Sequence, residues 1–163
     1  MAKRKAHHVR PEVNGYRYIQ KDAEILESPA YRDLTTLAKC LLDEFLIIYR
    51  DNRNGELGLD VRTAAKRLNV STNTVLNAFD DLVAHGFIVN TREEVWQKSV
   101  AREWRITFMP AKGKEPTDDW RNWKPGCPVR VTRRMRKKAI AKTTTGCRNN
   151  SDRPAADSET EGE

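Results

Sequence analysis

The hydrophobic residues between positions 60 and 87 recur every three or four residues, in two successive runs. This spacing places them on one face of an α-helix. The first run consists of Val61, Ala64, Ala65 and Leu68, and the second consists of Val75, Ala78, Phe79 and Leu82. The pattern breaks at Asn69 and Val70. We therefore predict two short helices joined by a tight turn.

The boundaries of both predicted helices carry residues that favour helix ends. Asp60 and Ser71 stand at the two starts, where a side-chain oxygen can accept hydrogen bonds from unpaired backbone amides. Gly86 follows the second helix, where the backbone often needs the positive φ that glycine adopts. Two helices joined by three or four residues form the helix-turn-helix pattern.

Before this pair, the pattern predicts a longer helix that begins after Thr35 and runs to about Tyr49. Its core-facing residues are expected to be Leu37, Ala38, Leu41, Leu42, Phe45 and Ile48. Cys40 falls among these positions, and we expect it to be a buried small apolar residue. Ser28 and Pro29 predict a further helix start, because proline at the first helical position loses no hydrogen bond.

Extended segments are also predicted around the helices. They fall at residues 16–26, which form a short strand or a lead-in, and at residues 57–59, 87–92 and 101–109. The last two would form a hairpin whose connecting residues, 93–100, make a wing. Alternation on the return strand places Trp104, Ile106 and Phe108 on one face, with Arg105 and Thr107 on the other. We expect Trp104 to be a core residue rather than a platform for a ligand.

Three helices followed by such a hairpin resemble the winged helix-turn-helix domains of bacterial, phage and plasmid regulators and replication initiation proteins. The resemblance covers residues 28–108 and is carried by SPAYRDLTTLAKCLLDEF, NGELGLDVRTAAKRLNVSTNTVLNAFDDLVAHGFI and AREWRITF. It implies a mainly α fold with a small β-hairpin, built as a three-helix core plus a wing. It also implies binding to double-stranded DNA, as a transcriptional regulator or as a replication initiation protein on origin DNA. The resemblance allows a homodimer.

All of the net charge lies outside this region. The formal net charge is +7, yet residues 29–109 hold 11 Lys or Arg and 11 Asp or Glu. Residues 1–28 hold 6 against 4, and residues 110–163 hold 13 against 8. We expect a disordered basic arm at 1–15, a domain at 16–109 and a largely disordered tail at 110–163. The tail contains a basic block at 130–142 and an acidic end at 157–163.

The start of the second motif helix is the candidate site for reading bases. In a helix-turn-helix, the first residues of this helix enter the major groove. The candidates are Ser71, Thr72, Asn73, Thr74 and Asn77. Asparagine can bond adenine through two atoms, and threonine offers a hydroxyl and a methyl group. A role in N-capping alone would fully explain why a serine occurs at position 71. It explains poorly why Asn73, Thr74 and Asn77 are polar.

Residues 71–86 contain no Lys or Arg, although they contain Asp80 and Asp81. Phosphate contacts supply much of the affinity for DNA, so they must come from other elements. The candidates are Arg62, Lys66 and Arg67 on the first motif helix, and Arg92, Lys98 and Arg102 on the wing. In the tail, Arg133, Arg134, Arg136, Lys137 and Lys138 either add non-specific affinity or only keep the tail soluble. For any one of these cationic residues, a solvated surface charge is a simpler interpretation than a phosphate contact.

Other classes of protein are disfavoured. The chain carries no phosphate-binding glycine loop, no HExxH motif and no nucleophile elbow, so we do not expect an enzyme. Cys40, Cys127 and Cys147 lack zinc-ligand spacing, and we expect no metal, cofactor or small-molecule ligand. No run reaches the ~18 apolar residues of a membrane helix, which suggests a cytoplasmic protein.

A second kind of partner is suggested by two indole side chains. Trp120 and Trp123 are spaced to share one face of a helical turn. This turn would dock back on the domain, or, as an alternative, bind a protein partner. A winged helix used only for protein contact is a further alternative to DNA binding.

Overall fold

The computed structural model describes residues 12–13, 16–91, 102–132 and 134–138. The chain divides into two compact units, residues 1–132 and 133–163. In the second unit, residues 134–138 are helical. The predicted wing at 93–100, the acidic end at 157–163 and most of the basic arm lie outside the described residues.

The described part of the first unit is mainly helical. Its helices are α1 (Ala23–Glu27), α2 (Pro29–Asp33), α3 (Thr36–Ile48), α4 (Val61–Leu68) and α5 (Thr72–Ala84), with 3-10 helices η1 (Asp51–Arg53) and η2 (Asp119–Asn122). Its strands are β1 (Glu12–Val13), β2 (Tyr16–Arg17), β3 (Leu57–Gly58), β4 (Ile88–Asn90) and β5 (Glu103–Ile106). The expected combination of a mainly α fold with a small β element is confirmed.

The predicted capping residues begin the helices as expected. The Asp60 carboxylate accepts hydrogen bonds from the backbone amides of Arg62 and Thr63, both at 2.9 Å, at the start of α4. The Thr35 and Ser71 hydroxyls accept from the amides three residues later, at the starts of α3 and α5. These bonds satisfy amides that the first helical turn leaves unpaired.

The turn between α4 and α5 reverses the chain within three residues. Asn69 adopts a left-handed conformation with a φ of 53°. The Val70 amide then donates to the carbonyl oxygen of Ala65 at 3.1 Å, so the end of α4 remains hydrogen-bonded. Asparagine tolerates this conformation better than most residues other than glycine.

The helices and a three-stranded antiparallel sheet enclose one core. The strand order is β3-β5-β4, with Leu57 opposite Trp104 and Ile88 opposite Ile106. Trp104 is 4% exposed, and its ring stacks on Phe79 with centroids 4.9 Å apart. Trp104 is therefore a core residue, as predicted.

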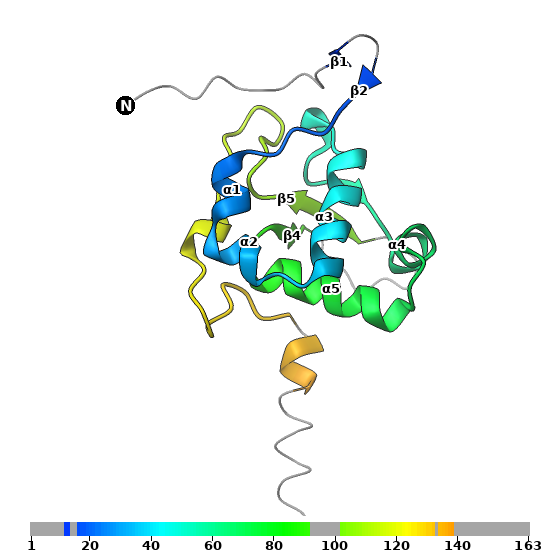
Figure 1. Cartoon of the computed structure of the whole chain (residues 1–163), viewed down its shortest axis with the longest axis vertical. Coiled ribbons are helices and arrows are strands. Elements are labelled where there is room, and N and C mark those ends of the chain that lie inside the picture. Colours follow the sequence, from blue (N-terminus) through cyan, green and yellow to red (C-terminus); the bar gives the residue numbers. More distant parts are fainter. Residues whose placement is uncertain (1–11, 14–15, 92–101, 133, 139–163) are drawn as a thin grey trace, which may run out of the picture. The chain divides into compact units, whose positions relative to one another are not determined.

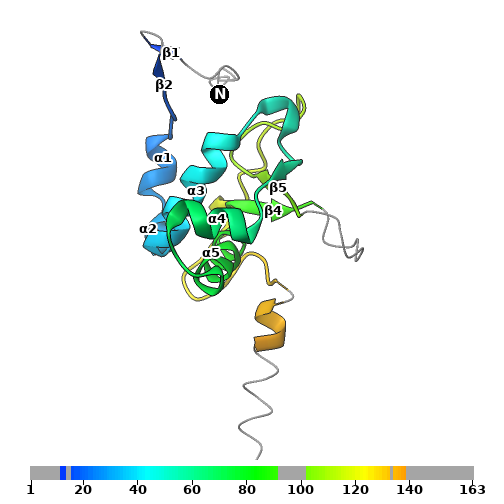
Figure 2. The same ribbon diagram turned by 90° about the vertical axis from the view of Figure 1, so that its right-hand side faces the viewer.

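Figure 1 shows α3 between α1 and α4, with α5 crossing below it and β4 and β5 behind. In Figure 2, α4 and α5 face the viewer, and β4 and β5 lie on the side away from α1 and α2. The start of α5 and the outer face of α4 thus lie on the surface of the unit.

Two local predictions were wrong, one of them in part. Of the segment at 16–26, predicted as a short strand or a lead-in, Tyr16–Arg17 form the strand β2, but residues 23–27 form α1, capped by Asp22. Cys40 is exposed, because it lies about 200° around α3 from the buried Ala38 at 100° per residue. Thr107, just beyond β5, is 1% exposed, and its hydroxyl donates to the Gly86 carbonyl oxygen at 2.7 Å.

The predicted domain end at Pro110 was also wrong. The first compact unit continues to Thr132. Trp120, on η2, is 5% exposed and belongs to the hydrophobic core. Its ring lies parallel to that of Phe87, with centroids 6.4 Å apart. Burial of this large apolar surface holds the segment after β5 against the domain.

Candidate nucleic-acid interface

The first turn of α5 is exposed to solvent, whereas the apolar face of the helix is buried. Val75, Ala78, Phe79 and Leu82 contact the core, as the apolar spacing predicts. The five predicted base-contacting residues, Ser71, Thr72, Asn73, Thr74 and Asn77, are all exposed. The structure therefore brings together on one surface a set of uncharged hydroxyl and amide groups.

Two of these hydroxyls take part in the helix cap. The Ser71 hydroxyl accepts from the Thr74 amide at 3.2 Å, and its oxygen lies 2.7 Å from the Thr74 hydroxyl oxygen. Capping thus accounts for Thr74 as well as Ser71, which corrects the expectation that it would explain Thr74 poorly. Thr72 and Asn73 lie on the same exposed turn, and they are the stronger candidates for reading bases.

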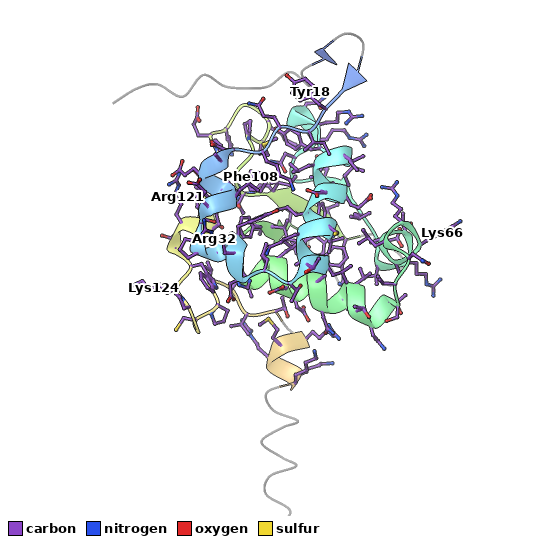
Figure 3. All side chains as sticks on the ribbon, viewed as in Figure 1. Tyr18, Arg32, Lys66, Phe108, Arg121 and Lys124 are labelled. Carbon is purple, nitrogen blue, oxygen red and sulfur yellow. The ribbon has the colours of Figure 1, made fainter. Side chains whose placement is uncertain are left out.

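The cations of α4 divide into two groups. Arg67 forms an ion pair with Glu44 of α3, with 3.0 Å between nitrogen and oxygen. Arg62 and Lys66 are exposed and form no ion pair with any residue that the structure describes. They are four residues apart, so they share one flank of α4. Figure 3 shows Lys66 pointing away from the body of the unit.

The remaining predicted phosphate contacts are only partly described. Arg102, next to β5, is exposed. Arg92 and Lys98 lie outside the described residues, as does Arg133 of the tail. Within residues 134–138, Arg134 is half-buried, whereas Arg136, Lys137 and Lys138 are exposed.

The two acidic residues of α5 are engaged within the protein. The Asp81 carboxylate accepts from the Thr35 amide at 3.0 Å and from the Thr35 hydroxyl at 2.8 Å. Burial would raise the pKa of Asp81, but hydrogen bonds from His85 and Thr35 lower it below its ordinary value. The Asp80 carboxylate accepts from the Thr132 hydroxyl at 2.9 Å. Both acids lie in the second half of α5, away from its exposed first turn.

His85, which caps the end of α5, is buried between acidic and aromatic groups. Its Nδ1 lies 2.8 Å from the Asp81 carbonyl oxygen, and its ring stacks on Trp123 with centroids 4.8 Å apart. Burial lowers the pKa of His85, but hydrogen bonds to Asp81 and Asp33 outweigh it and raise the pKa to about 9. His85 as a whole residue is 6% exposed, so these neighbours enclose most of it.

The segment after η2 runs back along α5. The Val129 amide donates to the Ala84 carbonyl oxygen at 2.7 Å, and the Thr132 hydroxyl reaches Asp80 one turn earlier in the helix. We call residues 129–132 the strap. Sequence patterns did not predict it, because its contacts join residues about 50 positions apart and show no local periodicity.

The burial of Trp120 tests whether this segment docks on the domain or presents its ring to a protein partner. The expectation that the Trp120 and Trp123 segment docks on the domain is confirmed. A partner-docking role for Trp120 required an accessible ring, and the domain itself covers that ring. Trp123 is half-buried against His85.

Comparisons of the chain with protein-family models, with curated proteins and with solved structures found no match. Among the residues described, no group of three or more His, Cys, Asp or Glu is arranged to hold a metal ion. No described helix has the length and apolar character needed to cross a membrane.

Proposed function

We propose that the chain binds double-stranded DNA through a winged helix-turn-helix and acts as a transcriptional regulator. In this proposal α3, α4 and α5 form the three-helix core, and β4 and β5 are the strands of the wing hairpin. The order α3-β3-α4-α5-β4-β5 and the strand order β3-β5-β4 support it. So does the three-residue turn between α4 and α5.

The observation that carries the proposal is the surface chemistry of the first turn of α5. Thr72, Asn73 and Asn77 expose a hydroxyl and two amides on the part of the helix that enters a major groove. These groups match the donor and acceptor pattern of base edges. A surface evolved only for solubility would have no need to exclude charge from this turn, where residues 71–79 contain no Asp, Glu, Lys or Arg.

Phosphate contacts would come from the borders of this surface. Arg62 and Lys66 on α4 are exposed cations that no described carboxylate neutralises, and Arg102 is exposed beside β5. Such contacts position a protein on the duplex and add salt-dependent affinity without reading sequence. Asp80 and Asp81 are bonded within the protein and lie in the other half of α5.

The test is selection of duplexes from a random pool by the full chain, followed by binding measurements on the enriched sequence. We expect Asn73→Ala to reduce the preference for that sequence over random duplex by roughly fivefold to a hundredfold, since one bidentate contact discriminates by about 1–3 kcal/mol. Asn52→Ala is the matched control, because Asn52 is an exposed asparagine on η1. It should leave the preference unchanged.

Failure of the wild-type chain to enrich any sequence would overturn the proposal and favour a winged helix that contacts only protein. Footprinting of the chain on DNA around its own gene then separates two roles. Protection of a promoter supports transcriptional control, whereas protection of repeated sites in a replication origin would replace the regulatory role with replication initiation.

A further inference from the structure

One stripe along α5 is exposed near the start of the helix and hydrogen-bonded to the strap near its end. Asn73, Asn77, Asp80 and Ala84 follow one another at intervals of four, three and four residues. At 100° per residue, these four positions lie within about 60° of one another around the helix. Asn73 and Asn77 are exposed. A molecule that docks along this stripe therefore meets two carboxamide groups.

The strap occupies the second half of the stripe. The Val129 amide donates to the Ala84 carbonyl oxygen at 2.7 Å, and the Thr132 hydroxyl donates to the Asp80 carboxylate at 2.9 Å. The part of α5 and its cap that stays open on this side runs from residue 71 to residue 77. At 1.5 Å per residue this is roughly 9 Å, which corresponds to about three base pairs of B-DNA at 3.4 Å each.

The side chains on this open part are matched to one kind of base pair. In the major groove, Arg or Lys reads guanine through two atoms, Asp or Glu accepts from the cytosine amino group, and Asn or Gln reads adenine through two atoms. Residues 71–79 contain no Arg, Lys, Asp or Glu. The next carboxylate along the stripe is that of Asp80, and Thr132 already donates to it. The open part therefore lacks the strongest readers of G·C pairs and holds two readers of adenine.

A second pair of residues beside the stripe supports the same choice. Thr72 and Leu76 are four residues apart, so they lie on one flank of the stripe. Thr72 is exposed and Leu76 is half-buried. Threonine and apolar side chains contact the methyl group of thymine, which no other base of DNA carries in the major groove. Because thymine pairs with adenine, contacts of both kinds favour A·T pairs.

We propose that α5 selects A·T base pairs, with Asn73 and Asn77 each reading one adenine within a core of about three base pairs. The inference rests on the DNA binding proposed above. The two asparagines lie about 6 Å apart along the helix axis, so their adenines should lie about two base-pair steps apart. Phosphate contacts from Arg62 and Lys66 would add affinity without changing this choice, because phosphates carry no sequence information.

The experiment uses the full chain and the duplex that it enriches from a random pool. We expect the enriched core to consist of A·T pairs. Each adenine of the core is then replaced by 7-deazaadenine, which pairs with thymine but lacks the N7 acceptor. At the adenine that Asn73 reads, this replacement should weaken wild-type binding by about twofold to tenfold, because one hydrogen bond is lost. The Asn73→Ala variant should lose nothing further from it. The same replacement outside the core is the matched control and should leave affinity unchanged.

A change of specificity provides a second measurement. Asn73→Arg should shift the preference at one core position from adenine to guanine, because arginine is the most common reader of guanine. Asn52→Arg adds the same charge at an exposed asparagine of η1 and should leave the preference unchanged. Thermal unfolding of each variant shows whether the domain remains folded.

The two proposals fail in different ways. If the wild-type chain enriches no sequence, the proposed function fails. If it enriches a sequence whose core consists of G·C pairs, DNA reading stands and the selection of A·T pairs is overturned. Equal losses from 7-deazaadenine in the wild type and in both Asn73→Ala and Asn77→Ala would likewise overturn the assignment of these asparagines to adenine.

Discussion

Nε2 of His85 lies 2.9 Å from Oδ2 of Asp33, which links the end of α5 to the end of α2. The other ring nitrogen of His85 contacts Asp81, and the Asp81 carboxylate holds the start of α3 through Thr35. His85 and Asp81 together thus link α5 to α2 and to α3. Because both ring nitrogens face oxygen acceptors, the doubly protonated and positively charged form of the ring is the one that satisfies them.

This arrangement predicts a pH-dependent stability. The pKa of His85 is about 9 in the folded protein, against 6.5 for an ordinary histidine. Its contribution should be fully present below pH 6.5, where the ring is charged in both states, and should be lost as the pH rises through about 9. One pKa unit corresponds to 1.36 kcal/mol, so a pKa of about 9 against 6.5 predicts a loss of about 3 kcal/mol. Urea unfolding at a series of pH values measures it.

His85→Gln is the variant that isolates this effect. It removes the titrating group, so its free energy of unfolding should vary much less between pH 6.5 and 9 than that of the wild type. Groups that titrate elsewhere in the chain are common to both proteins. Parallel pH profiles for the two proteins would show that His85 does not carry the charge assigned to it.

Gly86 and Gly113 offer a matched pair of substitutions. Both have a φ of 77°, but a Cβ added to Gly86 would lie 2.9 Å from the Asp119 carbonyl carbon and the Trp120 amide nitrogen, whereas at Gly113 nothing lies within 4 Å. Each alanine should cost about 1–2 kcal/mol for the left-handed backbone. Gly86→Ala should cost about 1–3 kcal/mol more, from the steric overlap. Equal losses on urea unfolding would contradict the close approach of η2.

The buried amide of Asn54 joins the turn after α3 to the end of the sheet. Its Nδ2 donates to the carbonyl oxygens of Ile106, Met109 and Pro110, all at 3.0 Å, and its Oδ1 accepts from the Ile106 amide at 2.8 Å. Asn54→Ala should lower the free energy of unfolding by about 3 kcal/mol, because buried backbone groups would lose their partners. Asn52→Ala, two residues earlier and exposed, should change it by less than about 0.5 kcal/mol. A comparable loss in both variants would refute this role.

Substitution of one lysine on α4 and one beyond η2 distinguishes a specific phosphate contact from a general effect of the net charge. Figure 3 shows Lys66 and Lys124 on opposite sides of the unit, and both are exposed. Lys66→Ala should weaken binding to selected and random duplexes by a similar factor and reduce the salt slope by about 1, because it removes one phosphate contact. Lys124→Ala removes the same charge away from the proposed interface. Fluorescence anisotropy over a range of salt concentrations should therefore show no change in slope for it, and equal effects would argue against α4 as the contact.

The sequence by itself determined helices α3, α4 and α5 and the exposed turn of α5. Capping bonds and apolar spacing act within one or two turns, so Asp60, Ser71 and the stripe from Val75 to Leu82 can be identified from neighbouring residues alone. The same spacing rule places Cys40 opposite Ala38 on α3, and an angular analysis would have corrected that error.

Only the tertiary structure decided where the domain ends and what the polar residues of α5 contact. The sequence pattern predicts that the domain ends at Pro110, yet Trp120 belongs to its hydrophobic core. The Thr132 hydroxyl is hydrogen-bonded to Asp80, which is 52 positions earlier in the chain. Asp81 reaches Thr35 across 46 positions. Such hydrogen bonds depend on how separate elements pack against one another, and the spacing of residues along the chain does not predict that packing. The sequence therefore identifies the exposed polar turn of α5, whereas only the packing of separate elements shows what the second half of that helix contacts.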